Sequence, residues 1–208
     1  MVAAPHAGPC AGKPKPYLMA DILILAAHPT LEHSRVTRSL IEAAQGETPR
    51  VALRDLYALY PDYYVDVAAE QAALLAATRV VFQFPFYWFS TPPLLKAWQD
   101  EVLAVGFAYG PGGTKTRGKL LQPVLTTGGG HEKYRPGGQN LYEVTELLKP
   151  LETMAHFVGM KMLPPLVLHH VPNVPGIPVP ADAEARIEEF AVAYRQLLSA
   201  PVAVAVLP

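Results

Sequence analysis

The chain has 208 residues and a formal net charge of −1, half of its residues are apolar, and its mean hydropathy is +0.16. This length suits one domain with a sizeable core, and the composition is typical of a globular chain rather than a disordered one. The near-zero charge gives no reason to expect nucleic acid as a partner, and the sequence has no run of about 18 apolar residues that could form a transmembrane helix.

Both ends of the chain are expected to lie outside the folded domain, which we place at residues 20–200. Residues 1–19 are rich in Pro and Gly and lack the continuous apolar segment of a signal peptide, so we expect a disordered extension there. The single Cys10 has no internal disulfide partner, which favours a reducing, cytoplasmic location. Residues 201–208 form an apolar tail.

Five short apolar segments predict β-strands, and a helical pattern follows each of them. Ser34 is placed to cap the first helix and Gly46 to end it, while Pro150 is expected to interrupt the fourth helix or to begin a second segment. The expected strands are Asp21–Ala27, Arg50–Leu56, Arg79–Pro85, 122–129 and 160–171. The expected helices are 34–46, 67–78, 92–105, 141–159 and 182–199.

Strict alternation of strand and helix predicts an α/β fold, with a parallel sheet covered by helices on both faces. Five strands favour the flavodoxin-like order 2-1-3-4-5. In such sheets, ligands bind beyond the carboxyl ends of the strands, close to the point where the strand order reverses. The loops after the first, third and fourth expected strands are therefore the candidate site.

The first loop leads into a helix, whose free N–H groups and dipole favour an anion. His28, Ser34, Arg35 and Thr37 can add hydrogen-bond donors for a phosphate group. A purely structural alternative remains open, in which Ser34 only caps the helix and His28 is an ordinary loop residue.

The second loop, within residues 84–96, has five aromatic rings in six positions. Rings and exposed loop backbone suit a flat, conjugated ligand, with Tyr87 and Trp88 as the best candidates to contact it. Phe84 belongs to the preceding strand by its position. The alternative is that the rings fill the core or a subunit interface, and both roles can hold together.

The third loop places three glycines at residues 128–130, which permits close approach of the backbone to a ligand, although a tight turn alone would explain them.

Other motifs are weaker. A P-loop-like run ends at Lys119, but Leu120 replaces the magnesium-binding hydroxyl and the run precedes a strand. His131, His169 and His170 lack a carboxylate or cysteine at metal-ligand spacing, and no nucleophile elbow is present.

Four motifs in order resemble a known family: AAHPTLEHSR, DLYALYPDYYVDVAAEQ, FPFYWFSTPPLLKAWQDEVLAVGFAYG and LTTGGG. From about Asp21 to Leu198 the chain resembles the flavodoxin-like-fold NAD(P)H quinone oxidoreductases. It is most similar to the branch whose members are ancillary reductases of glutathione-regulated potassium-efflux antiporters. The resemblance implies a homodimer with a flavin at each subunit interface, FMN rather than FAD, and NAD(P)H and a quinone as substrates.

The resemblance also implies a ping-pong transfer of two electrons as hydride. Two alternatives stay open: a regulatory subunit docked on an antiporter at the inner face of the membrane, and an azo- or nitro-reductase that differs only in its acceptor.

Residue by residue, the resemblance assigns the flavin phosphate to the first loop, the isoalloxazine to the second and the other side of the ring system to the third. Tyr134 matches a tyrosine that assists hydride transfer, whereas the histidine that accompanies it falls near Asn140, which cannot do acid–base work. Thr37 and Tyr87 depart from the Asn and Gln that are common in the family. The cofactor-binding residues implied are His28, Ser34, Arg35, Val36, Thr37, Phe86, Tyr87, Trp88, Phe89, Thr126, Thr127, Gly128 and Gly129.

Overall fold

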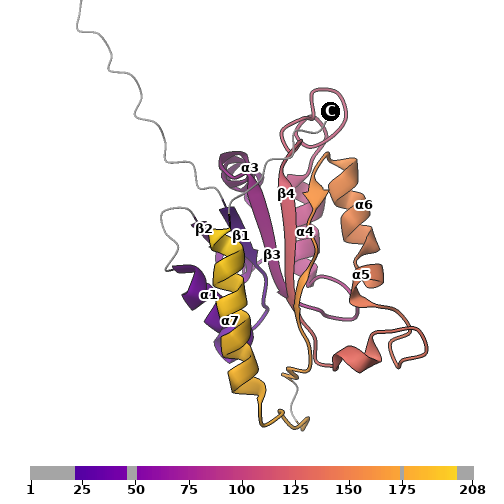
Figure 1. Cartoon of the computed structure of the whole chain (residues 1–208). Coiled ribbons are helices and arrows are strands. Elements are labelled where there is room, and N and C mark those ends of the chain that lie inside the picture. The colour runs from indigo at the N-terminus through magenta and orange to yellow at the C-terminus, as the bar shows by residue number, and fades with distance from the viewer. Residues whose placement is uncertain (1–21, 46–50, 174–175, 201–208) are drawn as a thin grey trace, which may run out of the picture.

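The computed structural model describes residues 22–45, 51–173 and 176–200. The expected N-terminal extension, the stop at Gly46 and the apolar tail at residues 201–208 lie outside the described residues. Figure 1 shows a central twisted sheet with helices packed on both of its faces.

The described residues form one sheet with parallel pairing throughout and the strand order β2-β1-β3-β4-β5, and a sixth strand, β6, also pairs with β4. The predicted flavodoxin-like order is therefore confirmed. The strands are β1 Ile22–Ala26, β2 Val51–Asp55, β3 Arg79–Pro85, β4 Leu120–Thr126, β5 Lys161–Met162 and β6 Leu166–Leu168.

The fifth predicted strand is divided in two. Pro164 and Pro165 separate β5 from β6, because proline has no N–H to donate to a strand ladder. The Pro164 carbonyl instead accepts a hydrogen bond from Gln122 Nε2 at 2.7 Å. This break lets β4 pair first with β5 and then with β6.

The helices divide between the two faces of the sheet (Figure 1). One core cluster packs α1 and α7 against the sheet and the other packs α3, α4 and α6 against the opposite face. Alternate β1 residues serve the two clusters, with Ile22 and Ile24 on one side and Leu23 and Leu25 on the other, as the pleat of a strand requires. The helices are α1 Arg35–Gln45, α2 Leu56–Leu59, α3 Val67–Ala76, α4 Pro93–Val102, α5 Val144–Leu147, α6 Lys149–Phe157 and α7 Ala183–Ser199.

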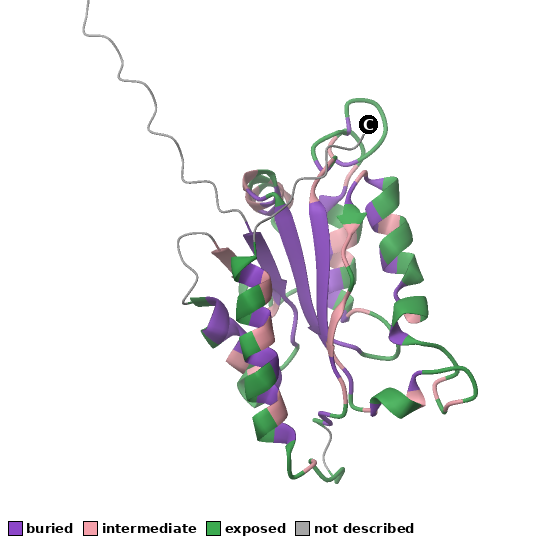
Figure 2. Cartoon of the chain, in the orientation of Figure 1, coloured by how far each residue is buried: buried purple, intermediate pink, exposed green. Residues whose placement is uncertain are grey.

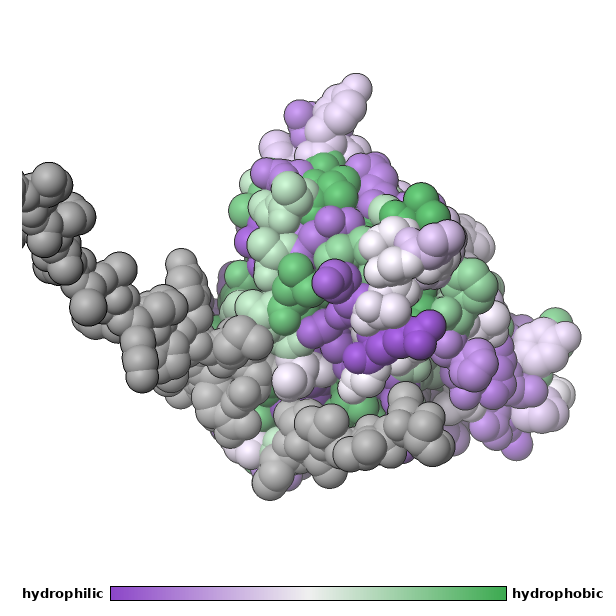
Figure 3. All heavy atoms as spheres, turned by 90° about the horizontal axis from the view of Figure 1, so that it is seen from above, coloured by the Kyte–Doolittle hydropathy of each residue, from purple (hydrophilic) through white to green (hydrophobic). Residues whose placement is uncertain are grey.

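The central strands are the most deeply buried part of the chain, as Figure 2 shows. All residues of β1 and β3 are buried, which agrees with the continuous apolar runs that predicted them. At the amino end of the sheet, viewed in Figure 3, hydrophilic and hydrophobic residues are interspersed over the coloured surface. The loops that follow the strands lie at the opposite end.

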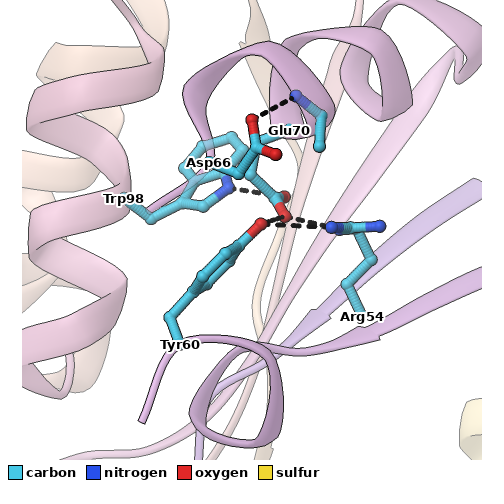
Figure 4. Close-up of polar contacts among 6 residues, drawn as sticks. Arg54, Tyr60, Asp66, Glu70 and Trp98 are labelled. Carbon is cyan, nitrogen blue, oxygen red and sulfur yellow. Dashed lines mark hydrogen bonds and ion pairs between the residues drawn. The ribbon is translucent and has the colours of Figure 1, made fainter. Parts of the chain in front are cut away.

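A buried polar cluster joins β2, α3 and α4 beneath the sheet (Figure 4). The Glu70 carboxylate is fully buried and accepts from Arg54 Nε at 2.5 Å, from the Tyr60 hydroxyl at 2.5 Å and from Trp98 Nε1 at 2.9 Å. Asp66 caps α3 beside it by accepting from the Ala69 N–H at 3.0 Å. The cluster thus fixes both ends of the segment between α2 and α3.

Candidate functional site

The loops after β1, β3, β4 and β6 enclose a cavity of about 420 Å³ at the carboxyl end of the sheet. This is the position where parallel sheets bind ligands. The cavity is lined by His28, Ser34, Arg35, Val36, Pro85, Phe86, Tyr87, Trp88, Thr126, Gly128, Val171, Pro172 and Asn173.

His28 lies at one end of the cavity and is 4% exposed. The Thr30 N–H donates to its Nδ1 at 3.2 Å, so Nδ1 acts as the acceptor and the ring hydrogen of the neutral side chain is on Nε2. Burial lowers the pKa of His28 below its usual 6.5. His28 therefore offers the cavity a neutral N–H donor.

The start of α1 forms the same end of the cavity. Ser34 caps the helix by accepting from the Thr37 N–H at 3.1 Å, and the side chain of Ser34 is buried. Arg35 and Val36, the first two helical residues, line the cavity, where first-turn N–H groups have no partner within the helix. Uncommitted donors and the helix dipole suit a phosphate at this point.

Arg35 and Thr37, both predicted to contact a phosphate at this end of the cavity, have hydrogen bonds or ion pairs with other parts of the chain. Arg35 Nη1 forms an ion pair with Glu184 Oε1 of α7 at 2.6 Å. Thr37 is buried and does not line the cavity, and its carbonyl accepts from Gln83 Nε2 at 3.2 Å. The structure thus brings Arg35 to the cavity edge and keeps Thr37 behind it.

The aromatic loop after β3 forms the adjoining wall. The Phe86 N–H donates to the Thr126 carbonyl at 2.8 Å, and the Ser90 N–H donates to the Tyr87 carbonyl at 2.9 Å. Trp88 and Phe89 have positive φ angles of 46° and 63°, a strained conformation for bulky residues. This strain is held by the turn and leaves the Trp88 side chain 92% exposed.

The four rings of this loop have different environments. Phe86 is buried against Phe89 and Tyr134, and Tyr87 meets the ring of His28 edge-on with centroids 6.4 Å apart. Trp88 borders both the main cavity and a smaller pocket of about 240 Å³, and Phe89 borders only the smaller one of these two.

The glycine loop after β4 faces both cavities. Thr126 and Gly128 line the main cavity and Gly129 lines the smaller pocket. A Cβ at Gly129 would lie 3.2 Å from Lys133 Cδ and 3.4 Å from Tyr134 Cε2, so this backbone runs directly beneath those side chains. Thr127 is buried and turns inward, and its hydroxyl donates to the Gly129 carbonyl at 2.7 Å.

Tyr134 lies in the wall of the smaller pocket beside Lys133 and Asn140. Its ring is buried, and burial raises the pKa of the phenol, against a smaller opposing effect of Thr127. Behind it lies His169, whose ring centroid is 5.5 Å from that of Tyr134. His169 Nδ1 is 3.0 Å from the Thr127 hydroxyl.

The loop after β6 was missed as part of the site. Val171, Pro172 and Asn173 line the main cavity, and Asn173 Nδ2 donates to the His33 carbonyl at 3.3 Å. His169 belongs to the same loop. The sequence signal for this loop was its position directly after the last strand, because ligands bind at the loops that follow the carboxyl ends of parallel strands.

Other motifs lie away from the cavity. Lys119 of the P-loop-like run precedes β4, at the opposite end of the sheet, and donates to the Ala77 carbonyl. Among residues 22–45, 51–173 and 176–200, no group of three or more His, Cys, Asp or Glu side chains could hold a metal ion. Within the same ranges no helix has the length and apolar character needed to cross a membrane.

The flavodoxin-like fold family matches residues 20–198. The chain belongs to this family. It is 48% identical over 142 residues to YdeQ of Bacillus subtilis (strain 168), described as an uncharacterised NAD(P)H oxidoreductase, with 68% of this chain and 72% of that protein covered. It is 47% identical over 148 residues to KefF of Salmonella arizonae, a glutathione-regulated potassium-efflux system ancillary protein, with 71% and 82% covered. The resemblance read from the four motifs is confirmed.

Solved structures of similar chains share the whole fold. General stress protein 14 of Treponema denticola, in complex with FMN, has a TM-score of 0.77 and 35% identity, covering 86% of this chain and 97% of that one. An NADPH-quinone reductase from P. pentosaceus has a TM-score of 0.74 and 29% identity, covering 87% and 99%.

A chain described as a thermophilic tryptophan halogenase from Streptomycin violaceusniger has a TM-score of 0.77 and 40% identity, covering 86% of this chain and 99% of that one. Similar chains thus carry different descriptions, and function must be argued from the site.

Proposed function

We propose that this protein is an FMN-dependent NAD(P)H:quinone oxidoreductase. The observation that carries this proposal is one cavity lined both by the start of α1 and by the aromatic loop after β3 and the glycine loop after β4. Relatives described as an NAD(P)H oxidoreductase and an NADPH-quinone reductase, and a similar chain in complex with FMN, support the choice of ligand and reaction.

The residues present fit a flavin mononucleotide. His28 Nε2–H, the Ser34 cap and the first turn of α1 would hold the phosphate, with Arg35 at the edge. Backbone groups of residues 86–88 on one side, and Thr126 and Gly128 on the other, would hold the ring system. When bound, FMN supplies two-electron transfer between NAD(P)H and the acceptor.

The protein would then position the substrates, exclude water and supply protons. The smaller pocket adjoins the aromatic loop and is where a flat substrate would lie, between Trp88, Phe89 and Tyr134. The Tyr134 phenol would donate its proton to the oxygen of a quinone that gains negative charge. Because the nicotinamide and the quinone would use the same pocket in turn, we expect ping-pong kinetics.

A homodimer is part of this proposal. Trp88 is almost fully exposed although it borders both pockets, and a second apolar groove continues from Phe89 between α4 and α6. A second copy packed on this groove would cover the exposed rings and complete the wall of the smaller pocket. Light scattering after size exclusion tests this, and Phe157→Glu, in the groove and 67% exposed, should produce monomers.

The enzymatic proposal is tested on purified protein. We expect a yellow protein that releases FMN on denaturation and oxidises NADPH or NADH when a quinone is supplied. A protein that binds no FMN and shows no quinone-dependent oxidation after FMN is added contradicts the proposal. Initial rates at several fixed quinone concentrations should give parallel double-reciprocal lines.

A second candidate function is that of an ancillary subunit of a potassium-efflux antiporter at the inner face of the membrane. It is favoured by the 47% identity to KefF of Salmonella arizonae. Co-purification of the tagged protein with an antiporter from detergent-solubilised membranes tests it. If a Ser34→Ala variant that no longer binds FMN still co-purifies with the antiporter, docking does not depend on flavin chemistry.

A further inference from the structure

The smaller pocket, of about 240 Å³, has a polar side as well as an aromatic one. Its polar side consists of Lys133, Gln139 and Asn140, and its other lining side chains are aromatic rings. All three polar side chains carry N–H groups that donate hydrogen bonds, and none has a hydrogen-bond or ion-pair partner among the described residues. Within the same part of the chain, no aspartate or glutamate lines this pocket.

The backbone at Gly129 lies beneath the point where these side chains meet. A Cβ at Gly129 would be 3.2 Å from Lys133 Cδ. It would also be 3.4 Å from Tyr134 Cε2 and 3.7 Å from Asn140 Nδ2. The Asn140 N–H donates to the Lys133 carbonyl at 2.9 Å, which holds the two ends of this turn together. The Lys133 stem therefore lies over Gly129, beside the Tyr134 ring and the Asn140 amide.

The Lys133 ammonium has no counter-charge among the described residues, although the side chain is partly buried. The carboxylate of the neighbouring Glu132 lies against Gly130 and does not line the pocket. By contrast, the exposed Lys96 and Lys149 each form an ion pair with a carboxylate on the same helix. A charge that is partly removed from water is stabilised by a counter-charge, so this pocket favours a ligand that brings one.

We propose that the smaller pocket takes an aromatic acceptor with an anionic group, a carboxylate or a sulfonate, and that Lys133 is the residue that selects it. The inference rests on the proposed quinone reductase function and names its class of substrate. The anionic group accepts hydrogen bonds from the Lys133 ammonium and the Asn140 amide, while the ring lies against the aromatic side. The Tyr134 phenol is left for the reacting oxygen of the acceptor.

The position of Lys133 favours the acceptor over NAD(P)H as the source of the anion. The phosphates of NAD(P)H are separated from the nicotinamide by a ribose, whereas Lys133 lies beside the Tyr134 ring in the wall of the pocket itself. The oxidised nicotinamide is also positively charged, so a lysine beside it favours its release before the acceptor enters.

Steady-state kinetics on the FMN-loaded protein measure this selection. The two acceptors are a naphthoquinone sulfonate and the corresponding methyl naphthoquinone, which share a ring system and differ in charge. We expect Lys133→Gln to lower the ratio of their kcat/KM values, sulfonate over methyl, by about three- to tenfold, between the effects of an exposed ion pair and a buried charged hydrogen bond. Lys133→Arg keeps the charge and should retain most of the ratio.

Arg135→Gln is the matched control. Arg135 is exposed in the same loop and does not line the pocket, and its loss changes the net charge by the same amount. This variant should keep the wild-type ratio. Added salt should lower the ratio in the wild type, because salt screens the ion pair, and should change it less in Lys133→Gln.

An unchanged ratio in Lys133→Gln, or an equal fall in Arg135→Gln, overturns the role of Lys133. A raised KM for NADPH with an unchanged acceptor ratio assigns the lysine to the nucleotide and also overturns it. Light scattering tests the other use of an unpaired ammonium, since monomers in Lys133→Gln and dimers in the wild type would assign Lys133 to a subunit contact instead. If the wild-type protein reduces neither quinone, the proposed function itself fails, which is a different result from an active enzyme without a preference.

A binding measurement needs no turnover. Isothermal titration calorimetry of the FMN-loaded protein compares naphthalene sulfonate with naphthalene sulfonamide, which are similar in shape and differ in charge. We expect the wild type to bind the sulfonate more tightly and Lys133→Gln to lose that difference. Equal affinities of the wild type for the two compounds overturn the proposal, whether or not the protein reduces quinones.

Discussion

Trp98 Nε1 donates a hydrogen bond to Glu70 Oε2 across 2.9 Å, which ties α4 to α3 in the interior. The other carboxylate oxygen of Glu70 accepts from Arg54 and Tyr60, so Glu70 has a partner on each side (Figure 4). A buried charge is stable only with such partners. Glu70 of α3 therefore links β2, Tyr60 at the end of α2, and α4.

We predict that Glu70→Ala lowers the free energy of unfolding by about 3–5 kcal/mol, because it leaves the partly buried Arg54 without its counter-charge and leaves the Tyr60 and Trp98 donors without their acceptor. Glu70→Gln keeps two polar positions in the same shape and should lose less, about 1–3 kcal/mol. Urea unfolding followed by fluorescence measures both. A loss below about 1 kcal/mol for Glu70→Ala would show that the cluster adds little.

The ion pair between Arg35 and Glu184 predicts opposite effects of two variants on FMN binding. Glu184→Gln frees Arg35 for the phosphate and should strengthen binding about two- to fivefold, the range of an exposed ion pair. Arg35→Gln should weaken binding. Fluorescence titration with FMN measures both, and Glu188→Gln is the control with the same change in net charge on α7. Equal strengthening by the two glutamate variants would point to a general charge effect.

The strained turn predicts an unusual result at Trp88. Trp88→Gly removes a side chain that is 92% exposed from a position with φ of 46°, so little burial is lost and the strain is relieved. We expect the free energy of unfolding to rise by about 0.5–1 kcal/mol while affinity for FMN falls. Urea unfolding of the flavin-free monomer measures the first effect. Tyr64→Gly, which is 83% exposed at an ordinary φ, should not be stabilising, and a gain in both variants argues against strain.

Stability should fall as the pH falls below about 6.5, the usual pKa of a histidine in an unfolded chain. Burial lowers the pKa of His28 and of His169 in the folded protein, so the unfolded chain takes up protons that the folded one refuses. Each full proton of difference lowers stability by about 1.4 kcal/mol per pH unit. The effect is absent above the unfolded pKa and grows until the folded pKa is reached.

Thermal unfolding between pH 8 and pH 5 measures this dependence. His28→Gln and His169→Asn should each flatten this pH dependence, because neither substitute titrates. His156→Asn is the control, in which the loss of stability due to His28 and His169 should persist. A wild-type profile that rises toward pH 5, or a slope unchanged in both variants, contradicts the assignment.

The fold was predictable because its signals are local. Continuous apolar runs gave β1 and β3 nearly to the residue, and Pro150 lies in the first turn of α6, the second helical segment that the pattern allowed for. The short helix α2 was missed because four residues show no periodicity, and it forms because Asp55 caps it by accepting from the N–H groups of Tyr57 and Ala58. Pro164 and Pro165 indicate a break in the fifth strand, although one continuous strand was predicted there.

The site was only partly predictable. Position after a strand identified three of the four loops that surround the cavity, and the roles assigned there to individual residues remain predictions. His169 could not be joined to Thr127 from the sequence, because they are 42 residues apart and meet only when β6 pairs with β4. The inward turn of Thr127 and the ion pair of Arg35 likewise depend on tertiary contacts that no local pattern encodes.

The two prolines between β5 and β6 have a consequence for the protein's behaviour at high concentration. An uninterrupted edge strand offers a row of unpaired N–H and C=O groups on which another chain can add a strand. Here that edge is reduced to pieces of two and three residues, separated by a stretch in which Pro164 and Pro165 offer no N–H. This side of the sheet is therefore poorly suited to templating aggregation, and Pro164→Thr combined with Pro165→Thr should remove that protection.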